Sequence, residues 1–279
     1  MTDRSQATQS SRTIGAQVGV QDVQSVDSWL TDRIVTVIVG PEEKRWIVHE
    51  KLLVSQSDFF RDYFMDGHDE LKLPDDEPRL FALFIRWLYG TAFVPSGGTR
   101  NFRFLPPDGV TVTVRDYLGV YVLGGKFGIV GVRNAVLDVL YAYYGDTAPG
   151  SEHHQRAPNM HDITYIFAHT ARDAPMRRFL IAHALFYLFS RARSSRGART
   201  SSSSSSALLL LPLDWEQVLS ESAEVGYEMI RMLAEWNWVM GANAPRMTIK
   251  ARTEFHERVP APASPVKQEL AEDEEGIPI

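Results

Sequence analysis

Hydrophobic residues in the first third of the chain follow spacings typical of short strands. Residues 34–39 (IVTVIV) place Ile and Val on both faces around Thr36, which predicts a strand that is covered on each side. Residues 40–43 (GPEE) are a turn signal, and residues 45–48 then predict a second strand that pairs with the first as a hairpin. Residues 71–73 (LKL), directly before a proline, predict a third short strand.

Helix signals alternate with these strands. Ser57 is placed to cap a helix, because its side-chain oxygen can accept a hydrogen bond from the backbone one turn later. Phe60 and Phe64 then share one face of that helix at i, i+4 spacing. Residues 75–78 (DDEP) are a second helix start. Behind it, an apolar stripe falls at i, i+4, i+7 and i+8: Leu80, Phe84, Trp87 and Leu88.

Helical periodicity also dominates the rest of the chain. Residues 92–110 are rich in proline and glycine and predict an irregular insertion. Residues 115–144 predict helices that break near Gly124-Gly125 and Gly128, and residues 163–189 predict two more around a proline break. Residues 214–240 form a further amphipathic stretch that carries Trp215, and its Trp236 and Trp238 are expected to pack on a helix face rather than to stack on a ligand.

Composition shifts along the chain predict its organisation. Serine-rich, proline-rich and strongly charged stretches separate the segments that have apolar periodicity. We expect a disordered N-terminal tail (1–27), a first domain (28–145) and a helical extension (159–190). An Arg/Ser-rich linker (191–207), a C-terminal helical segment (213–256) and a disordered acidic tail (257–279) are expected to follow.

Composition and charge exclude several classes of protein. Among 279 residues, 44% are hydrophobic and 23% charged, so a sizeable core is expected. The formal net charge of -6 argues against nucleic acid as the main partner. The absence of cysteine excludes disulfides and thiolate nucleophiles and fits a reducing compartment. With no secretory h-region and no apolar run of about 20 residues, we expect no membrane association and an intracellular location, in the nucleus, the cytoplasm or both.

No pattern of catalytic or metal-binding residues emerges. The strongest candidate metal ligands are Glu152, His153 and His154, with His161 and His169 downstream, but neighbouring histidines diverge and no HExxH spacing follows. The chain also lacks a G-x-S-x-G elbow and a phosphate-binding glycine loop. We therefore expect no enzyme activity, no metal and no cofactor.

The order of elements from Asp32 to Thr91 resembles the core of a BTB/POZ domain. The positions that carry this resemblance are Asp32, Val37, Val39, His49, Leu53, Ser57, Phe60, Phe64, Leu88 and Tyr89. Residues 121–144 and 163–189 are similar to the helices that follow the core in fungal BTB-domain proteins, here without a kelch or zinc-finger extension. The resemblance implies an α+β fold, in which a small mixed sheet is surrounded by helices and followed by a helical C-terminal extension.

The same resemblance implies a function in protein–protein interaction, as an adaptor. Such domains self-associate, recruit the cullin scaffold of ubiquitin ligases or dock transcriptional co-regulators. We expect a homodimer that pairs through residues 14–30 and 49–64. At the start of the first helix of the core, His49 is expected to hydrogen-bond backbone groups, and a role as a pH-sensitive group is the alternative.

The predicted partner-binding residues surround the end of the second helix of the core. They are Phe64, Met65, His68 and Glu70. Family adaptors that bind the cullin place a hydrophobic residue two positions before a glutamate in this loop. Here the glutamate is Glu70 and the anchor position holds His68, so we expect weak or absent cullin recruitment.

Two features outside the core suggest other roles. Arg191, Arg193, Arg196 and Arg199 lie in the Arg/Ser-rich linker and could contact nucleic acid or an import receptor, which makes a transcriptional regulator the alternative function. A structural homo-oligomer is a third. In the acidic tail, residues 266–269 (VKQE) resemble the acceptor site for the ubiquitin-like modifier SUMO, with Lys267 as the acceptor; a solubilising tail is the other interpretation.

Overall fold

The computed structural model describes residues 33–92, 111–145, 156–197, 213–240 and 251–258. Its sheet has three strands, β1 (Ile34–Val39), β2 (Lys44–His49) and β3 (Glu70–Leu73), in the order β2-β1-β3. The β1–β2 pair is antiparallel and the β1–β3 pair is parallel. The predicted hairpin and third strand are therefore confirmed, and so is the α+β class.

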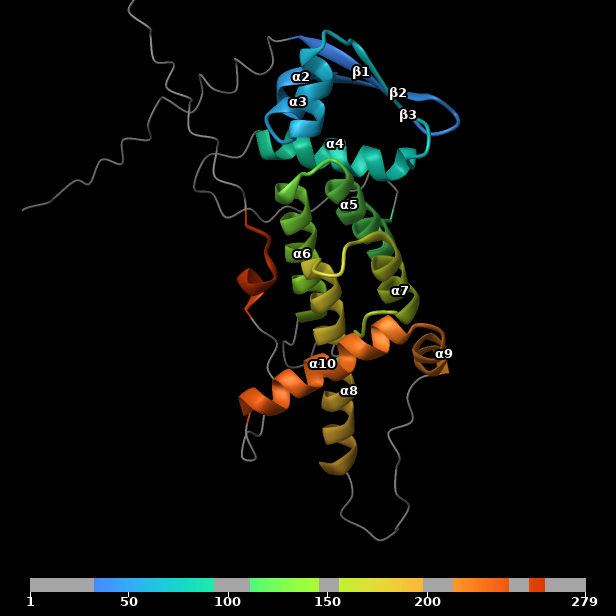
Figure 1. Ribbon diagram of the computed structural model, residues 1–279, viewed down its shortest axis with the longest axis vertical. Coiled ribbons are helices and arrows are strands. Elements are labelled where there is room, and N and C mark those ends of the chain that lie inside the picture. Colours follow the sequence, from blue (N-terminus) through green and yellow to red (C-terminus); the bar gives the residue numbers. More distant parts are fainter. Residues whose placement is uncertain (1–32, 93–110, 146–155, 198–212, 241–250, 259–279) are drawn as a thin grey trace, which may run out of the picture.

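Three helices pack on this sheet. They are α2 (Glu50–Val54), α3 (Asp58–Met65) and α4 (Pro78–Ala92). Ser57 caps α3 as predicted, because its side chain accepts a hydrogen bond from the backbone of Phe60. Figure 1 shows α2 and α3 beside the sheet and α4 lying below both.

The helices α5 (Val114–Lys126) and α6 (Val130–Gly145) form a close antiparallel pair. The predicted break at Gly128 is confirmed: its φ of +68° lies in the left-handed region, which glycine adopts without a steric penalty. The predicted break at Gly124-Gly125 is wrong, because α5 runs through both residues. A Cβ atom on Gly124 would lie 2.5 Å from Val132 Cγ1, so this glycine lets α5 and α6 approach each other.

A proline break separates α7 (Met160–His169) from α8 (Pro175–Gly197), as the sequence predicted. The predicted start of the linker at residue 191 is wrong, because α8 continues through Gly197. Residues 191–193 are Arg-Ala-Arg, and both residue types favour helix, so the helix extends beyond the apolar part of the segment. Residues 198–207 of the predicted linker lie outside the described residues.

The C-terminal helices are α9 (Leu213–Glu221) and α10 (Ala223–Met240), followed by the short 3₁₀ helix η1 (Arg252–Phe255). In Figure 1, α10 crosses over α8, and it contacts α7, α8 and α9. Trp215 is buried, whereas the side chains of Trp236 and Trp238, for which packing was predicted, lie outside the described residues.

The predicted start of the disordered tail at residue 257 is also wrong. The Asn134 side chain holds Glu257 by two hydrogen bonds: the Glu257 N–H donates to Oδ1, and the Glu257 carbonyl accepts from Nδ2. The acidic composition that predicted disorder begins only later, beyond the described residues that end at Arg258. The predicted N-terminal tail and the 93–110 part of the insertion likewise lie outside the described residues.

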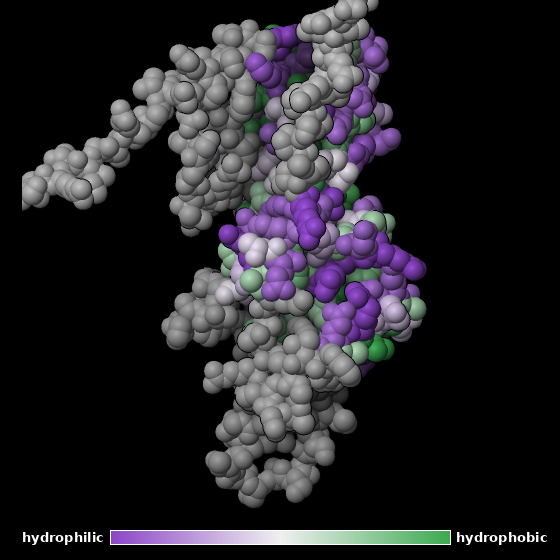
Figure 2. All heavy atoms as spheres, turned by 60° about the vertical axis from the view of Figure 1, so that its left-hand side comes forward, coloured by the Kyte–Doolittle hydropathy of each residue, from purple (hydrophilic) through white to green (hydrophobic). Residues whose placement is uncertain are grey.

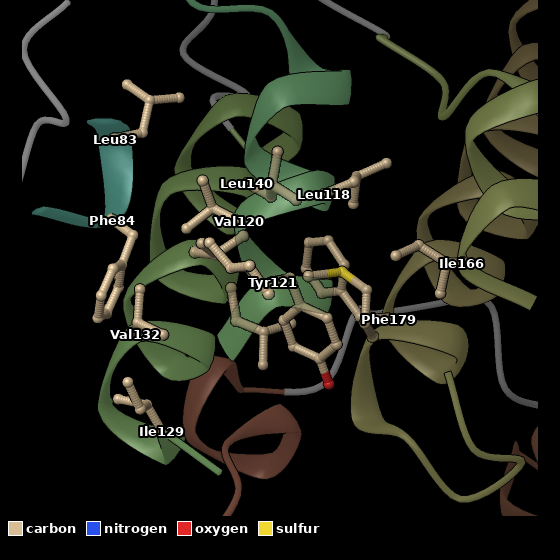
Figure 3. Packing of buried hydrophobic residues seen from close by; sticks show 14 of the residues in the cluster. Leu83, Phe84, Leu118, Val120, Tyr121, Ile129, Val132, Leu140, Ile166 and Phe179 are labelled. Carbon is tan, nitrogen blue, oxygen red and sulfur yellow. The ribbon is translucent and has the colours of Figure 1, made fainter. Parts of the chain in front are cut away.

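One hydrophobic core runs from the sheet to α10. Figure 3 shows its middle, where Leu118 and Tyr121 of α5 lie between Leu140 of α6 and Ile166 of α7. The core therefore continues across the expected boundary between the first domain and the helical extension. Hydrophilic residues dominate the coloured atoms of the face in Figure 2, with apolar residues in small areas between them. Within the described part of the chain, no helix is long and apolar enough to cross a membrane.

Candidate protein-interaction surface

The predicted partner-binding residues lie where α3 ends and β3 begins. Met65, the last residue of α3, is 76% exposed, and His68 and Glu70 are exposed beside it. Phe64 is only 1% exposed, so its predicted role in partner binding is wrong. Its i, i+4 relation to Phe60 turns it inward, where the two rings stack with centroids 6.4 Å apart.

Arg33, directly before β1, fixes the loop that joins α3 to β3. Its Nη2 atom donates to the carbonyl oxygens of Gly67, at 3.3 Å, and His68, at 2.8 Å. Its Nε atom donates to Asp69 Oδ1 at 3.0 Å, and this hydrogen bond raises the pKa of Arg33. On its other side, Arg33 Nη1 lies 3.1 Å from Glu50 Oε2. One guanidinium thus holds three consecutive residues of the loop.

Tyr63 supports the same loop from α3. Its hydroxyl donates to the backbone carbonyl of Glu70 at 2.8 Å, and its ring lies 4.8 Å from the His68 ring between centroids. We call the exposed group Met65, His68, Asp69 and Glu70 the α3–β3 surface. Because its loop is fixed from two sides, a partner would pay little conformational entropy to order it.

The residues that carried the BTB/POZ resemblance are mostly interior. Leu53, Phe60 and Leu88 are buried in the core, and Asp32 lies outside the described residues. The expected hydrogen bond from the His49 side chain to backbone is wrong: Nδ1 lies 2.8 Å from the Tyr89 hydroxyl instead. Two predicted signature residues therefore contact each other, although they are 40 positions apart.

Exposed apolar side chains also occur near the segments predicted to pair in a homodimer. Phe59 of α3 is 40% exposed, with its ring 5.4 Å from the Phe127 ring between centroids. Ile34 of β1 and Ile47 of β2 are exposed on the sheet. Of the predicted pairing segments, residues 49–64 are described and residues 14–30 lie outside the described residues.

An open cleft of about 730 Å³ lies between the β1–β2 turn and the start of α4. Its charged lining includes Asp76 and Arg79, which are engaged in ion pairs with Lys126, at 2.6 Å, and Asp116, at 2.7 Å. These ion pairs hold α4 against α5. Because the two charges have this structural role, we propose no catalytic or binding function for the cleft. Across the described residues, no group of histidine and carboxylate side chains could hold a metal ion.

Arg33 and Tyr63 were not found from the sequence. Arg33 reaches Asp69 only because β1 and β3 are adjacent parallel strands, which brings together residues 36 positions apart. No local pattern signals such a contact. The side chains of Arg191, Arg193 and Arg196, together with Arg199 and Lys267, lie outside what the structure describes.

Comparison with known proteins does not extend this picture. No protein-family model matches the chain, and no curated protein matches it. The resemblance to BTB/POZ domains therefore depends on the residues themselves and on the order of the elements.

Proposed function

We propose that the chain is a protein-interaction module of the BTB/POZ type, which works by contact and has no chemistry of its own. The α3–β3 surface carries this proposal. It presents the exposed Met65 side chain beside a loop that Arg33 and Tyr63 hold in place. An exposed apolar side chain can be buried by a partner, and a backbone that is already fixed loses little conformational entropy on binding. The absence of cysteine supports action inside the cell, in the nucleus, the cytoplasm or both.

The order of the elements supports the BTB/POZ assignment. A β-hairpin, a short helical pair, a third strand parallel to the first and the long helix α4 follow one another as in that family. Self-association through the α2–α3 side belongs to the same proposal, and Phe59 offers exposed aromatic surface there.

Sedimentation of the full chain over a range of concentrations tests self-association. We expect a homodimer, which Phe59→Glu weakens about tenfold or more, since a charge would be buried in an apolar contact. Tyr143→Glu is the matched control, because Tyr143 on α6 is 39% exposed against 40% for Phe59. A monomer at every concentration, or equal weakening by both variants, contradicts the proposed dimer. Thermal melting of each variant checks that it is folded.

Cullin recruitment is proposed to be weak, because His68 replaces the apolar anchor. Titration of the full chain with the cullin scaffold should show weak or no binding, and His68→Leu should strengthen it by burying an apolar side chain. Tight binding by the wild type that is lost in Glu70→Lys would contradict this. Binding of duplex DNA that weakens steeply with salt would instead favour the alternative, a transcriptional regulator.

A further inference from the structure

The segment 251–258, which we call the C-terminal segment, lies against the helices α6 and α8. It contains η1, drawn in red beside α6 in Figure 1, and it contacts α6 and α8. Among the described residues, its backbone–backbone hydrogen bonds are internal, from Glu254 N to Ala251 O and from His256 N to Thr253 O. Its attachment to the helices therefore depends on side chains.

One aromatic side chain anchors the segment. Phe255 is 5% exposed and meets the Phe179 ring of α8 edge-on, with centroids 5.4 Å apart. It joins the hydrophobic core, although residues on both sides of it in the segment are exposed or half-buried. A single buried aromatic residue in an otherwise exposed segment is typical of a peptide ligand.

Asn134 of α6 recognises the backbone of the segment. Its Nδ2 atom donates to the carbonyl oxygen of Glu257 at 2.9 Å, and its Oδ1 atom accepts from the Glu257 N–H at 2.8 Å. This pair of hydrogen bonds satisfies both backbone groups of one residue. It recognises the backbone N–H and carbonyl groups, whichever side chain the residue carries.

Two residues recognise the acid at the same position. Glu257 Oε1 accepts a hydrogen bond from the Tyr121 hydroxyl at 2.9 Å and lies 2.6 Å from Arg133 Nη2. Figure 3 shows the Tyr121 hydroxyl pointing toward the η1 side of the core. Burial raises the pKa of Tyr121 to about 12, so this hydroxyl remains a donor at neutral pH. The contact therefore favours a carboxylate.

Asp138, one turn along α6 from Asn134, adds a preference for positive charge. Its Oδ1 atom lies 2.6 Å from His256 Nε2 and 3.1 Å from Arg252 Nε. The groove thus recognises four features of its occupant: a buried aromatic ring, a carboxylate two residues later, a basic residue earlier, and the backbone N–H and carbonyl groups of the acidic residue. Charge complementarity between the groove and the segment is complete at these positions.

We propose that this groove, formed by α5, α6 and α8, is a binding site for peptides with the pattern Phe-x-acid, and that the C-terminal segment occupies it in cis. The partner is a protein segment that carries an aromatic residue, a carboxylate two positions later and a basic residue before them. Residues 241–250 separate the segment from α10, so the tether is only ten residues long. Displacement of the tethered segment would regulate access of the partner.

Fluorescence anisotropy with a labelled ARTEFHER peptide, the sequence of residues 251–258, tests the proposal on the full chain. The tethered segment competes at an effective concentration of roughly millimolar, so the wild type should bind the peptide weakly. Phe255→Ala removes the anchor of the competitor, and we expect it to bind the peptide about tenfold more tightly or better. The control peptide ARTEAHER should bind neither protein.

Two further variants keep the test decisive. Glu257→Gln weakens the tethered segment without changing the buried Phe255, so it should also bind the peptide more tightly than the wild type, even if Phe255→Ala fails to fold. Adding Asn134→Ala to either variant should abolish that gain. The proposal is overturned if a folded Glu257→Gln protein binds the peptide no better than the wild type, or if Asn134→Ala leaves the gain unchanged.

Discussion

The His49 Nδ1 atom lies 2.8 Å from the Tyr89 hydroxyl, and the same oxygen accepts a hydrogen bond from the His49 backbone N–H at 3.2 Å. One tyrosine of α4 therefore satisfies two groups at the junction of β2 and α2. Their rings also meet edge-on, with centroids 5.9 Å apart. This contact fixes the sheet and the α2–α3 pair to the helix that connects them with the rest of the molecule.

Tyr89→Phe should lower the free energy of unfolding by about 1–2 kcal/mol, because it leaves two half-buried polar groups without a partner. Denaturant titration measures the loss. A double-mutant cycle with His49→Ala should give a coupling energy of about 1 kcal/mol. Strict additivity of the two substitutions would show that the hydrogen bond contributes nothing.

Ser57→Ala should also destabilise the fold by about 1–2 kcal/mol. The buried Ser57 hydroxyl donates to the Phe127 carbonyl at 2.6 Å and accepts from the Phe60 N–H at 3.3 Å. It thus caps α3 and ties α3 to the α5–α6 turn. Ser55→Ala is the control, because the exposed Ser55 only donates to Leu52 within its own turn. Equal losses in the two variants, measured by denaturation, would argue against a special role for Ser57.

Two glycines with similar backbone conformations should differ in how well they tolerate alanine. Gly40 and Gly67 have φ values of +79° and +86°. A Cβ atom on Gly40 would lie 2.7 Å from Pro78 Cγ, whereas one on Gly67 would meet nothing within 4 Å. Gly67→Ala should therefore cost only the left-handed strain of about 1 kcal/mol, and Gly40→Ala about 2 kcal/mol or more. Thermal or chemical denaturation compares them, and a Gly67→Ala cost as large as that of Gly40→Ala contradicts the steric explanation.

Local patterns were sufficient to predict most elements. The strands, the Ser57 cap and the start of α4 each depend on residues within one or two turns of each other, so the chain itself carries the signal. The error at Gly124 arose because glycine can serve close packing as well as helix termination, and only the position of Val132 decides between them.

The candidate surfaces were less predictable, because they depend on contacts between distant residues. Met65 and Glu70 could be predicted from the resemblance to BTB/POZ domains. The support that Arg33 gives to their loop could not, because it depends on the pairing of β1 with β3, and no local spacing in the sequence indicates that pairing. The resemblance implies a partner-binding role for Phe64, but its i, i+4 relation to the buried Phe60 places its ring in the core. Glu257 was assigned to a tail by composition, although a groove more than 100 positions earlier holds it.

His183 of α8 is a buried histidine in an aromatic environment. Its side chain is 3% exposed, and its Nε2 atom has no hydrogen-bond partner. The rings of Tyr141, Tyr144 and Phe179 surround it, with the Phe179 centroid 4.5 Å away. Burial lowers the pKa of His183 from 6.5 to about 4, because the charged imidazolium would lose its hydration.

This pKa makes folding depend on pH. Between about pH 6.5 and pH 4 the unfolded chain binds a proton at His183 that the folded chain does not, so stability should fall as the pH falls through this window and stay level above it. The full loss is about 3 kcal/mol, from 1.36 kcal/mol for each pKa unit. Denaturant titrations at several pH values should show a shallower dependence for His183→Leu than for the wild type. Leu185→Ala, a core truncation on the same helix, should lower stability at every pH and keep the wild-type slope. Identical slopes in the wild type and His183→Leu would mean that His183 accepts its proton in the folded state.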